Sequence, residues 1–342
     1  MSVFLGDNAQ GKSNLLEAIY FISTGKSFRT NKPAEMVQWG QQQFDICCEV
    51  DFCDVSHRIE ASIGENGSRY LLDGKPRRGS SIFGNFKAVV FANEDLDVVR
   101  QEPATRRRFF DLFFTQIDSE YGKRLDDVNR VVRSRNQLLK LERFDDLSPW
   151  NDLLIREGSW LIARRKEFLG EFEQAAMQHH RSLSDAREAL TLQYKTHCEG
   201  DSREAVAAAM ARKLAEHALH ERALKTTLTG PHRDDYEISI GNKSVRQFGS
   251  EGQKRSAMLS LRLAQWRFLE KRFGEQPMIL LDDVLGELDA RRQMAFMDLV
   301  TQSGAQAFIA LTQATEYLHS VSSAMFRISA GRLVNESNIA RA

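Results

Sequence analysis

Eight residues near the start of the chain have the types and spacing of a phosphate-binding loop. A glycine, four variable residues and Gly-Lys-Ser make the Walker A pattern, here Gly6, Asp7, Asn8, Ala9, Gln10, Gly11, Lys12 and Ser13. The glycines let backbone N–H groups close around phosphates, and the start of a helix adds a favourable dipole. Lys12 would reach the β- and γ-phosphates of ATP, and the Ser13 hydroxyl would be a ligand of Mg²⁺. The loop therefore predicts ATP binding by Gly6 to Asn14.

Two carboxylates follow an apolar stretch in the last quarter of the chain. Met278–Leu281 is strand-like and ends in Asp282 and Asp283, which is the Walker B pattern. Asp282 would hold Mg²⁺ through water, whereas Asp283 would polarise the attacking water. Asp283 and Lys12 are therefore the predicted catalytic residues, and Ser13 and Asp282 the predicted metal ligands.

A third group of residues opens a predicted helix from about Gly252 to Phe273. Ser250, Gly252 and Gln253 make a second anion site, because a helix start presents free N–H groups. The two Walker motifs lie near opposite ends of the chain, too far apart for a compact GTPase-like or kinase-like fold. The pattern favours an ATP-binding-cassette head, in which the nucleotide is held between Walker A of one copy and Ser250 to Gln253 of another.

The elements that must position these residues alternate between strand and helix patterns. Residues 44–92 alternate apolar and polar residues between turns, which predicts an antiparallel β meander that includes a buried strand at Phe86–Ala92. A stripe of apolar residues from Phe110 to Leu139 predicts one long helix, and Ser148-Pro149 starts another. Later patterns predict a helix at 203–225, a hairpin near 236–242, apolar strands at 278–281 and 305–311, and a hairpin at 326–334.

These patterns predict an α/β P-loop head that is split by an inserted helical lobe with a coiled-coil arm. The expected segments are 1–100 for the P-loop and β meander, 101–228 for the helical lobe, and 229–342 for the rest of the head. Arg133, Arg135, Arg164, Arg165 and Lys166 lie on the arm, where a solvated face is the favoured interpretation over DNA contact.

Composition sets outer limits on the protein class. The chain has 342 residues, with 47 Lys plus Arg against 47 Asp plus Glu, so any polyanion site must come from local charge. No apolar run is long enough to span a membrane, and the N-terminus does not have the pattern of a signal peptide. The four cysteines show neither metal-ligand nor disulfide-framework spacing. A cytoplasmic protein without a membrane partner is expected.

Together these motifs resemble the RecF family of bacterial recombination-repair ATPases, which are related to the heads of SMC and Rad50 proteins. The matching stretches span nearly the whole chain: Gly6 to Tyr20 with Thr24 to Thr30, Val89 to Asp95 with Pro103 and Arg106 to Asp111, Thr229 to Asp235, Phe248 to Ser256 and Leu280 to Asp289. In family members further strands of the head precede the P-loop strand. Their absence would expose a strand edge and remove part of the pocket for the nucleotide base.

The resemblance implies a weak ATPase that dimerises on ATP and binds single-stranded and gapped or junction DNA. It also implies partnership with RecR and RecO in loading recombinase, and roles in replication and SOS induction. By the same resemblance Glu287 to Asp289 match the D-loop, Asn93 to Asp95 the Q-loop region, and Thr312 the position of a switch histidine.

Arg106, Arg107 and Arg108 are the candidate DNA-phosphate contacts, which would be independent of sequence and sensitive to salt. A solvated helix start or a pair with Asp111 is the alternative. Two other functions stay open. The protein could be a scaffold that does not hydrolyse ATP and whose fold is merely stabilised by bound nucleotide. It could also be a short SMC- or Rad50-like head, although its arm is too short for the long coiled coil of those proteins.

A transporter subunit is disfavoured, because the insertion is a helical arm.

Overall fold

The computed structural model divides the chain into two compact units. It describes residues 1–30, 32–52, 55–65, 67–79, 82–183, 189–284, 290–313, 318 and 324–337. The first unit joins Met1–Asp95 to Gln265–Ala342, and the second is Leu96–Ala264. Residues 229–264, which the sequence groups with the ATPase head, belong to the second unit.

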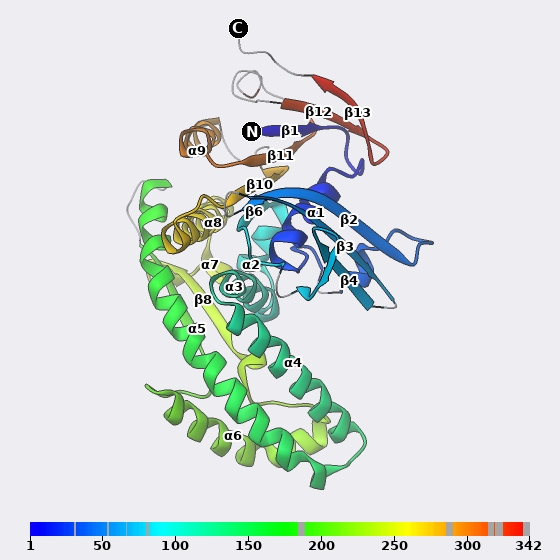
Figure 1. Ribbon diagram of the computed structural model, residues 1–342. Helices are drawn as coiled ribbons and strands as arrows, with labels where there is room; N and C mark the ends of the chain where they lie inside the picture. The colour runs from blue at the N-terminus through cyan, green and yellow to red at the C-terminus, as the bar shows by residue number, and fades with distance from the viewer. Residues whose placement is uncertain are drawn as a thin grey trace. The chain divides into compact units, whose positions relative to one another are not determined.

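A six-stranded sheet forms the centre of the first unit (Figure 1), in the order β13-β12-β1-β11-β10-β6. Its strands are β1 (Ser2–Leu5), β6 (Ala88–Ala92), β10 (Met278–Asp282), β11 (Ala307–Leu311), β12 (Ala324–Ser329) and β13 (Arg332–Ser337). All neighbours are parallel except the β12–β13 hairpin. Parallel strands end at one edge, so the residues that follow β1, β6, β10 and β11 meet there.

Helix α1 (Lys12–Thr24) lies between this sheet and a second one. Leu16 and Tyr20 pack against Val90, Leu280 and Ala310 of the large sheet. On its other side, Phe21 and Ile22 pack against the sheet β2-β3-β4-β5. That sheet consists of β2 (Gln43–Phe52), β3 (Val55–Gly64), β4 (Gly67–Leu72) and β5 (Lys75–Arg77), preceded by the short helix η1 (Pro33–Met36).

The predicted antiparallel meander is confirmed for β2 to β5, but its last strand is wrongly placed. β6 lies parallel to β10 in the large sheet, with Ala92 opposite Asp282. All five of its residues are buried, which is typical of a strand with both faces covered. The predicted strands β10 and β11 and the hairpin β12–β13 are confirmed, whereas α9 (Ala290–Ser303) was not predicted.

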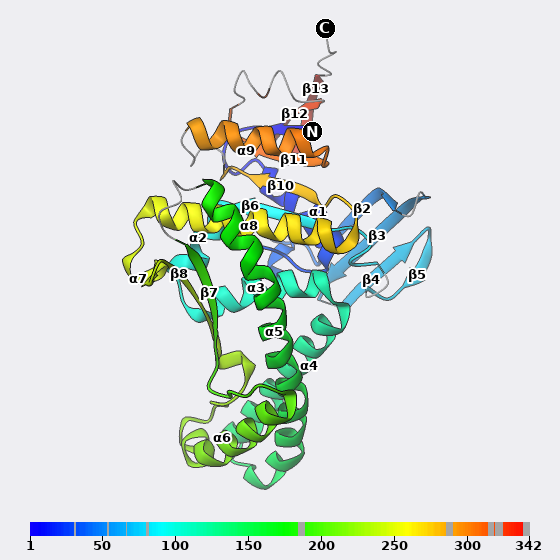
Figure 2. The ribbon, with the colours of Figure 1, turned by 90° about the vertical axis from the view of Figure 1, so that its left-hand side faces the viewer.

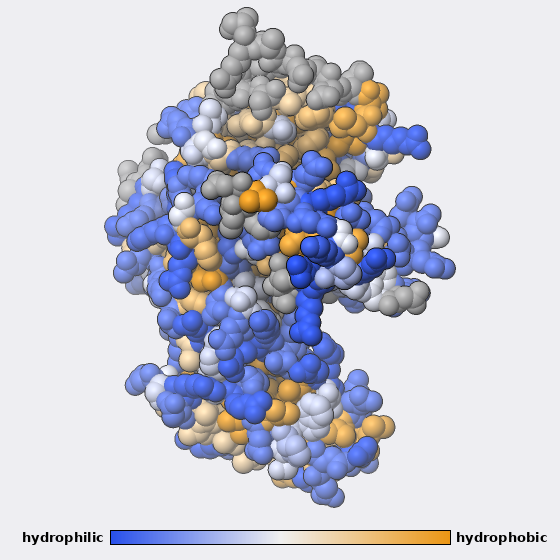
Figure 3. All heavy atoms as spheres, in the orientation of Figure 1, coloured by the Kyte–Doolittle hydropathy of each residue, from blue (hydrophilic) through white to orange (hydrophobic). Residues whose placement is uncertain are grey.

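Apolar side chains reach the surface at the end of this sheet. Leu333 and Val334 of β13 are 55% and 54% exposed. Figure 3 shows apolar residues gathered where Figure 1 places β12 and β13, on a face that is otherwise mostly hydrophilic.

The second unit is largely helical, with a small antiparallel sheet in the order β7-β8-β9. Its helices and strands are α2 (Leu96–Arg100), α3 (Pro103–Ile117), α4 (Ser119–Lys140), η4 (Phe144–Leu147), α5 (Ser148–Leu183), β7 (Leu190–Lys195), α6 (Arg203–Leu224), η5 (Pro231–Arg233), β8 (Asp235–Ile240), β9 (Lys243–Ser244), α7 (Val245–Phe248) and most of α8 (Glu251–Phe273). α4 and α5 lie side by side as the predicted helical arm, and α6 packs along α5 (Figures 1 and 2).

The prediction of one long helix over the Phe110–Leu139 stripe is wrong. The helix breaks at Asp118, whose backbone is extended and whose side chain accepts a hydrogen bond from the N–H of Glu120. Asp118 is therefore the N-cap of a new helix, α4. The apolar stripe continues across the break because both helices bury the same side.

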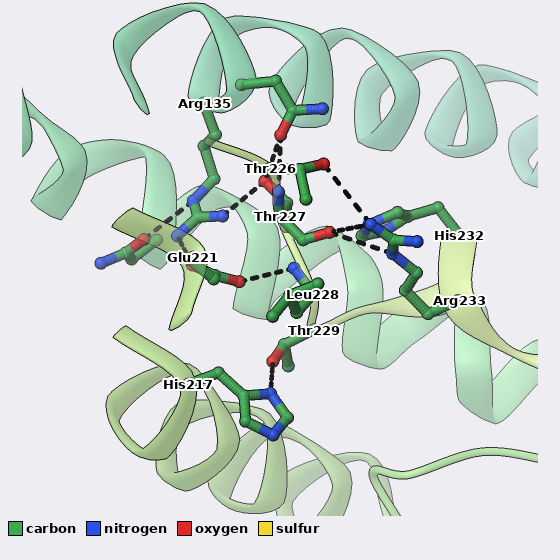
Figure 4. Close-up of polar contacts among 11 residues, drawn as sticks. Arg135, His217, Glu221, Thr226, Thr227, Leu228, Thr229, His232 and Arg233 are labelled. Atoms are coloured by element: carbon green, nitrogen blue, oxygen red, sulfur yellow. Dashed lines mark hydrogen bonds and ion pairs between the residues drawn. The ribbon is translucent and has the colours of Figure 1, made fainter. Parts of the chain in front are cut away.

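The prediction of a solvated arm face is wrong for Arg135 and Arg165, which are only 2% and 1% exposed. Figure 4 shows Arg135 pointing toward Glu221 and Thr227. Its guanidinium bonds Oε2 of Glu221, on α6, at 2.9 Å and Oγ1 of Thr227, beyond the end of α6, at 2.7 Å. Arg165 forms a bidentate pair with Asp111 at 2.8 and 2.9 Å. A buried guanidinium is tolerated when carboxylates and carbonyls take up its donors.

Candidate nucleotide site

Lys12 begins α1, directly after the loop that leaves β1. Its side chain is buried at 6% exposure, and its Nζ donates to the carbonyl oxygens of Gly6 at 2.6 Å and Asp7 at 2.8 Å. Within the described part of the chain no carboxylate pairs with Lys12. The positive charge is held only by dipoles of its own loop, an arrangement that suits an anionic ligand.

The loop backbone is arranged to leave the start of α1 open. Gly11 is the N-cap residue in a left-handed conformation with φ 100°, and no described side chain caps the helix there. The first N–H groups of α1 are therefore available to an anion. Ala9 also has a positive φ of 62°, and such a strained backbone is typical of functional loops.

The structure brings the two predicted metal ligands together. The Ser13 hydroxyl donates to Asp282 Oδ1 at 2.8 Å, although the two residues are far apart in sequence. Burial raises the pKa of Asp282, the Ser13 hydrogen bond opposes that rise, and the nearby charge of Glu94 adds to it. The site therefore holds a desolvated negative charge beside a hydroxyl at the sheet edge.

These groups fit a hard divalent cation such as Mg²⁺. Mg²⁺ keeps several waters and needs only one or two carboxylates besides the phosphates, and a cation would relieve the charge on the buried Asp282. The described residues contain no cluster of three or more His, Cys, Asp or Glu that could hold a metal by itself. Ser13 and Asp282 are the residues that would hold Mg²⁺.

The predicted Q-loop region lies beside Asp282. Asn93–Asp95 forms the short helix η3 directly after β6, whose Ala92 is opposite Asp282. The Asp95 carboxylate accepts from the N–H of Ala92 at 3.0 Å. Glu94 is exposed, and its negative charge adds to the rise in the pKa of Asp282 that burial causes.

Arg29 is a charged neighbour to which the sequence reasoning gave no role. Its Nη1 donates to Asn14 Oδ1 at 2.9 Å and lies 3.4 Å from Glu17 Oε2. Burial raises the pKa of Asp282, and the positive charge of Arg29 opposes that rise. The only signal for Arg29 in the sequence was its place in the matching stretch Thr24 to Thr30, because the distance between Arg29 and Asp282 depends on folding.

Asp283 and Thr312 follow neighbouring strands at the same edge. Asp283 has a left-handed backbone with φ 54°, and its N–H donates to Ala310 O at 3.1 Å. Thr312 is exposed directly after β11. The role of Asp283 as the catalytic carboxylate and that of Thr312 at the switch position stay predictions. Glu287 to Asp289 lie outside the described residues.

The predicted signature residues belong to the second unit, at the start of α8. Ser250 and Gln253 form a reciprocal capping box: the Ser250 N–H donates to Gln253 Oε1 at 2.9 Å, and the Gln253 N–H donates to Ser250 Oγ at 3.3 Å. Ser250 and Gly252 are exposed. A capping box leaves other N–H groups of the first turn free, so this helix start can still receive an anion.

The arginines proposed for DNA contact are partly engaged inside the second unit. Arg106 is 4% exposed, and its guanidinium bonds both carboxylate oxygens of Asp235 at 2.7 and 2.9 Å. Arg107 donates to the backbone oxygen of Asp234 at 2.6 Å, and burial lowers its pKa. This geometry favours the structural interpretation for Arg106, with Asp235 rather than Asp111 as its partner.

The fold and the site define a P-loop ATPase head of the SMC class. The model of the RecF/RecN/SMC N terminal domain matches residues 1–333. A crystal structure of an SMC head bound to the C-winged helix domain of ScpA has a TM-score of 0.52, covering 99% of this chain and 90% of that one, at 15% identity. That likeness concerns the fold alone.

Closer likenesses narrow the class to one family. The DNA replication and repair protein RecF of Symbiobacterium thermophilum is 35% identical over 98% of this chain and 92% of its own length. RecF of Lachnoclostridium phytofermentans is 35% identical over 93% of this chain and 88% of its own length. A structure of the recombination mediator protein RecF with ATP, in the RecFOR pathway, has a TM-score of 0.87 at 30% identity, covering 98% of this chain and 91% of that one. The chain belongs to the RecF family of DNA replication and repair proteins.

None of the helices that the structure describes has the length and apolar content needed to cross a membrane.

Proposed function

We propose that this protein binds ATP at Gly6 to Asn14 and uses it to clamp two copies of the chain onto DNA during recombinational repair and replication. The observation that carries the proposal is Lys12, a buried cation whose partners among the described residues are carbonyl oxygens of its own loop. A phosphate would supply the missing negative charge. A RecF relative has been solved with ATP, which supports this choice of nucleotide.

Hydrolysis in this proposal is slow and resets the clamp. Asp283 would polarise the attacking water, with Ser13 and Asp282 holding Mg²⁺ and Lys12 stabilising charge on the phosphates. Mg²⁺, when bound, would supply neutralising charge at the β- and γ-phosphates. ATP would then act chiefly as a conformational switch between single and paired copies.

Pairing would use the exposed start of α8. Ser250, Gly252 and Gln253 of one copy would contact the phosphates held by the P-loop of another. The paired copies would bind single-stranded, gapped or junction DNA through phosphate contacts. The solved RecF relatives act in the RecFOR pathway, which supports RecO and RecR as partners. With these partners the protein would load recombinase and contribute to SOS induction.

The first test compares DNA binding with ATP and with ADP at one fixed salt concentration, by fluorescence anisotropy on a gapped duplex. Salt must be fixed because phosphate contacts release counterions. Clearly tighter binding with ATP is expected. Equal affinity in both states would contradict the clamp.

The second test measures ATP turnover in the wild type and in Asp283→Asn. The variant is expected to lose hydrolysis and to keep the tight ATP-dependent DNA complex, since only the reset is removed. Asp298→Asn is the matched control, because Asp298 is an exposed aspartate of α9. Wild-type turnover at background level would instead support the non-hydrolysing scaffold.

A further inference from the structure

The turn between β12 and β13 contacts the P-loop through two hydrogen bonds. The N–H of Gly331 donates to the backbone oxygen of Gln10 at 2.9 Å, and the N–H of Ala330 donates to Gln10 Oε1 at 2.6 Å. Sheet order explains the contact: β12 is the neighbour of β1, with Arg327 opposite Leu5, and the P-loop continues from β1. The labels in Figure 1 show the hairpin beside β1.

Both glycines of the Walker A pattern face this hairpin at close range. A Cβ on Gly6 would lie 2.3 Å from the carbonyl oxygen of Ile328, a distance that no side chain tolerates. A Cβ on Gly11 would lie 3.3 Å from Gly331 Cα. Gly6 is not among the residues with positive φ, so the approach of the hairpin, rather than its own conformation, explains why it is glycine.

The hairpin contacts a loop whose backbone is strained. Ala9 and Gly11, on either side of Gln10, have φ values of 62° and 100°. A non-glycine residue in this region costs on the order of 1–3 kcal/mol and persists only where its surroundings hold it. Ala330 and Gly331 also have left-handed backbone conformations, with φ values of 49° and 71°. In this conformation both of their N–H groups point at Gln10.

We propose that the β12–β13 turn, Ser329–Arg332, is a clasp that holds the P-loop in its phosphate-binding shape before nucleotide arrives. Gln10 is the positioning residue: its side chain binds the hairpin instead of the nucleotide. The clasp lowers the entropic cost of nucleotide binding, because the P-loop backbone is already ordered before the nucleotide binds. This inference rests on the proposed binding of ATP at this loop.

The test uses Gln10→Met, which keeps side-chain length and removes the acceptor for Ala330. Titration with the fluorescent analogue mant-ATP in Mg²⁺ is expected to show affinity weakened by about 3- to 10-fold, as for a lost neutral hydrogen bond. The thermal midpoint should change little, because Gln10 is not in the core. Unchanged mant-ATP affinity would overturn the clasp.

A glycine pair provides the matched control. Gly331 and Gly304 share a φ of 71°, and a Cβ on either meets no atom within 4 Å. Gly331→Ala and Gly304→Ala therefore strain a turn equally, but only Gly331 touches the P-loop. The clasp requires that Gly331→Ala weakens mant-ATP binding more than Gly304→Ala; equal effects would count against it.

Hydrogen–deuterium exchange separates the clasp from the proposed function. Coupling is reciprocal, so mant-ATP should slow exchange in a peptide spanning 324–334, and Gln10→Met should speed exchange in a peptide spanning 6–16 without nucleotide. If the wild type binds no mant-ATP, the proposed function fails and the clasp is judged on the nucleotide-free exchange alone. Unchanged exchange of residues 6–16 in Gln10→Met would overturn it.

Discussion

Lys12 in the first unit and Arg165 in the second are both buried cations, but their partners differ in kind. Lys12 Nζ contacts two carbonyl oxygens of its own loop. Arg165 has a bidentate carboxylate, Asp111, and also donates to the hydroxyl of Tyr121 at 3.0 Å and the carbonyl of Pro231 at 2.7 Å.

The difference separates a binding residue from a structural one. Arg165 is neutralised by a carboxylate from another helix, so its bonds tie α3, α4 and α5 together. Among the described residues Lys12 contacts backbone dipoles and no carboxylate, so its charge is compensated fully when an anion arrives. Burial of a cation is therefore weak evidence of function until its partners are known.

The largest expected effect comes from Arg165→Ala. It leaves the Asp111 carboxylate without its bidentate partner, so the free energy of unfolding should fall by about 3–5 kcal/mol, measured by urea denaturation. Arg164→Ala is the control on the same helix. Arg164 is 33% exposed and pairs with Glu167 and Asp118, so its loss should cost no more than about 1 kcal/mol. An equal fall in the free energy of unfolding for both variants would contradict the structural role of Arg165.

Lys12→Ala should weaken nucleotide binding and leave stability unchanged, in contrast to Arg165→Ala. Nucleotide affinity is expected to weaken by roughly 10- to 100-fold, the range for a hydrogen bond to a charged group. The free energy of unfolding should not fall, since no described carboxylate loses a partner. Lys32→Ala, at a side chain that is 78% exposed, should change neither quantity. A Lys12→Ala variant that loses stability but not affinity would make Lys12 a structural residue like Arg165.

The buried His232 of the second unit should make the stability of the protein depend on pH. Burial lowers its pKa from 6.5 to about 4, and its Nε2 lies 3.1 Å from Thr227 O (Figure 4). The unfolded chain takes up the proton first on acidification, so stability should be lost between pH 6.5 and 4, by at most about 3 kcal/mol. His232→Gln should flatten this dependence in urea denaturation, whereas His220→Gln, at an exposed site on α6, should follow the wild type. Parallel curves for all three proteins would contradict this account.

The smallest expected effect is a gain of stability in Asp282→Asn. Burial raises the pKa of Asp282, so the folded protein binds the proton more tightly than the unfolded chain. Stability is then lost as the pH rises through the folded pKa. The amide removes that penalty and can still accept from Ser13, so the thermal midpoint at pH 7 should rise slightly while Mg²⁺-dependent nucleotide binding weakens. A lower midpoint in scanning fluorimetry would show that the carboxylate is stabilising.

Local patterns predicted most of the elements near the site. The strand–loop–helix around Gly6 to Ser13, the strand that ends at Asp282 and the helix that begins after Ser250 are all present. Each depends on short-range rules of turn, cap and periodicity. The break at Asp118 was missed because the apolar stripe is continuous across it, and the N-cap alone is a weaker signal.

What the sequence by itself determined is the chemistry that is available: a P-loop, paired carboxylates and a second helix start suited to an anion, and with them the family. The tertiary structure decided which groups meet. Only sheet order places β6 beside β10, Ser13 against Asp282 and the β12–β13 turn on Gln10. Only helix packing decides that Arg135 and Arg165 are buried while Arg164 stays partly exposed. The physical reason is that the free energy of a charged side chain depends on the partners and water around it, and those are set by segments far away in the chain.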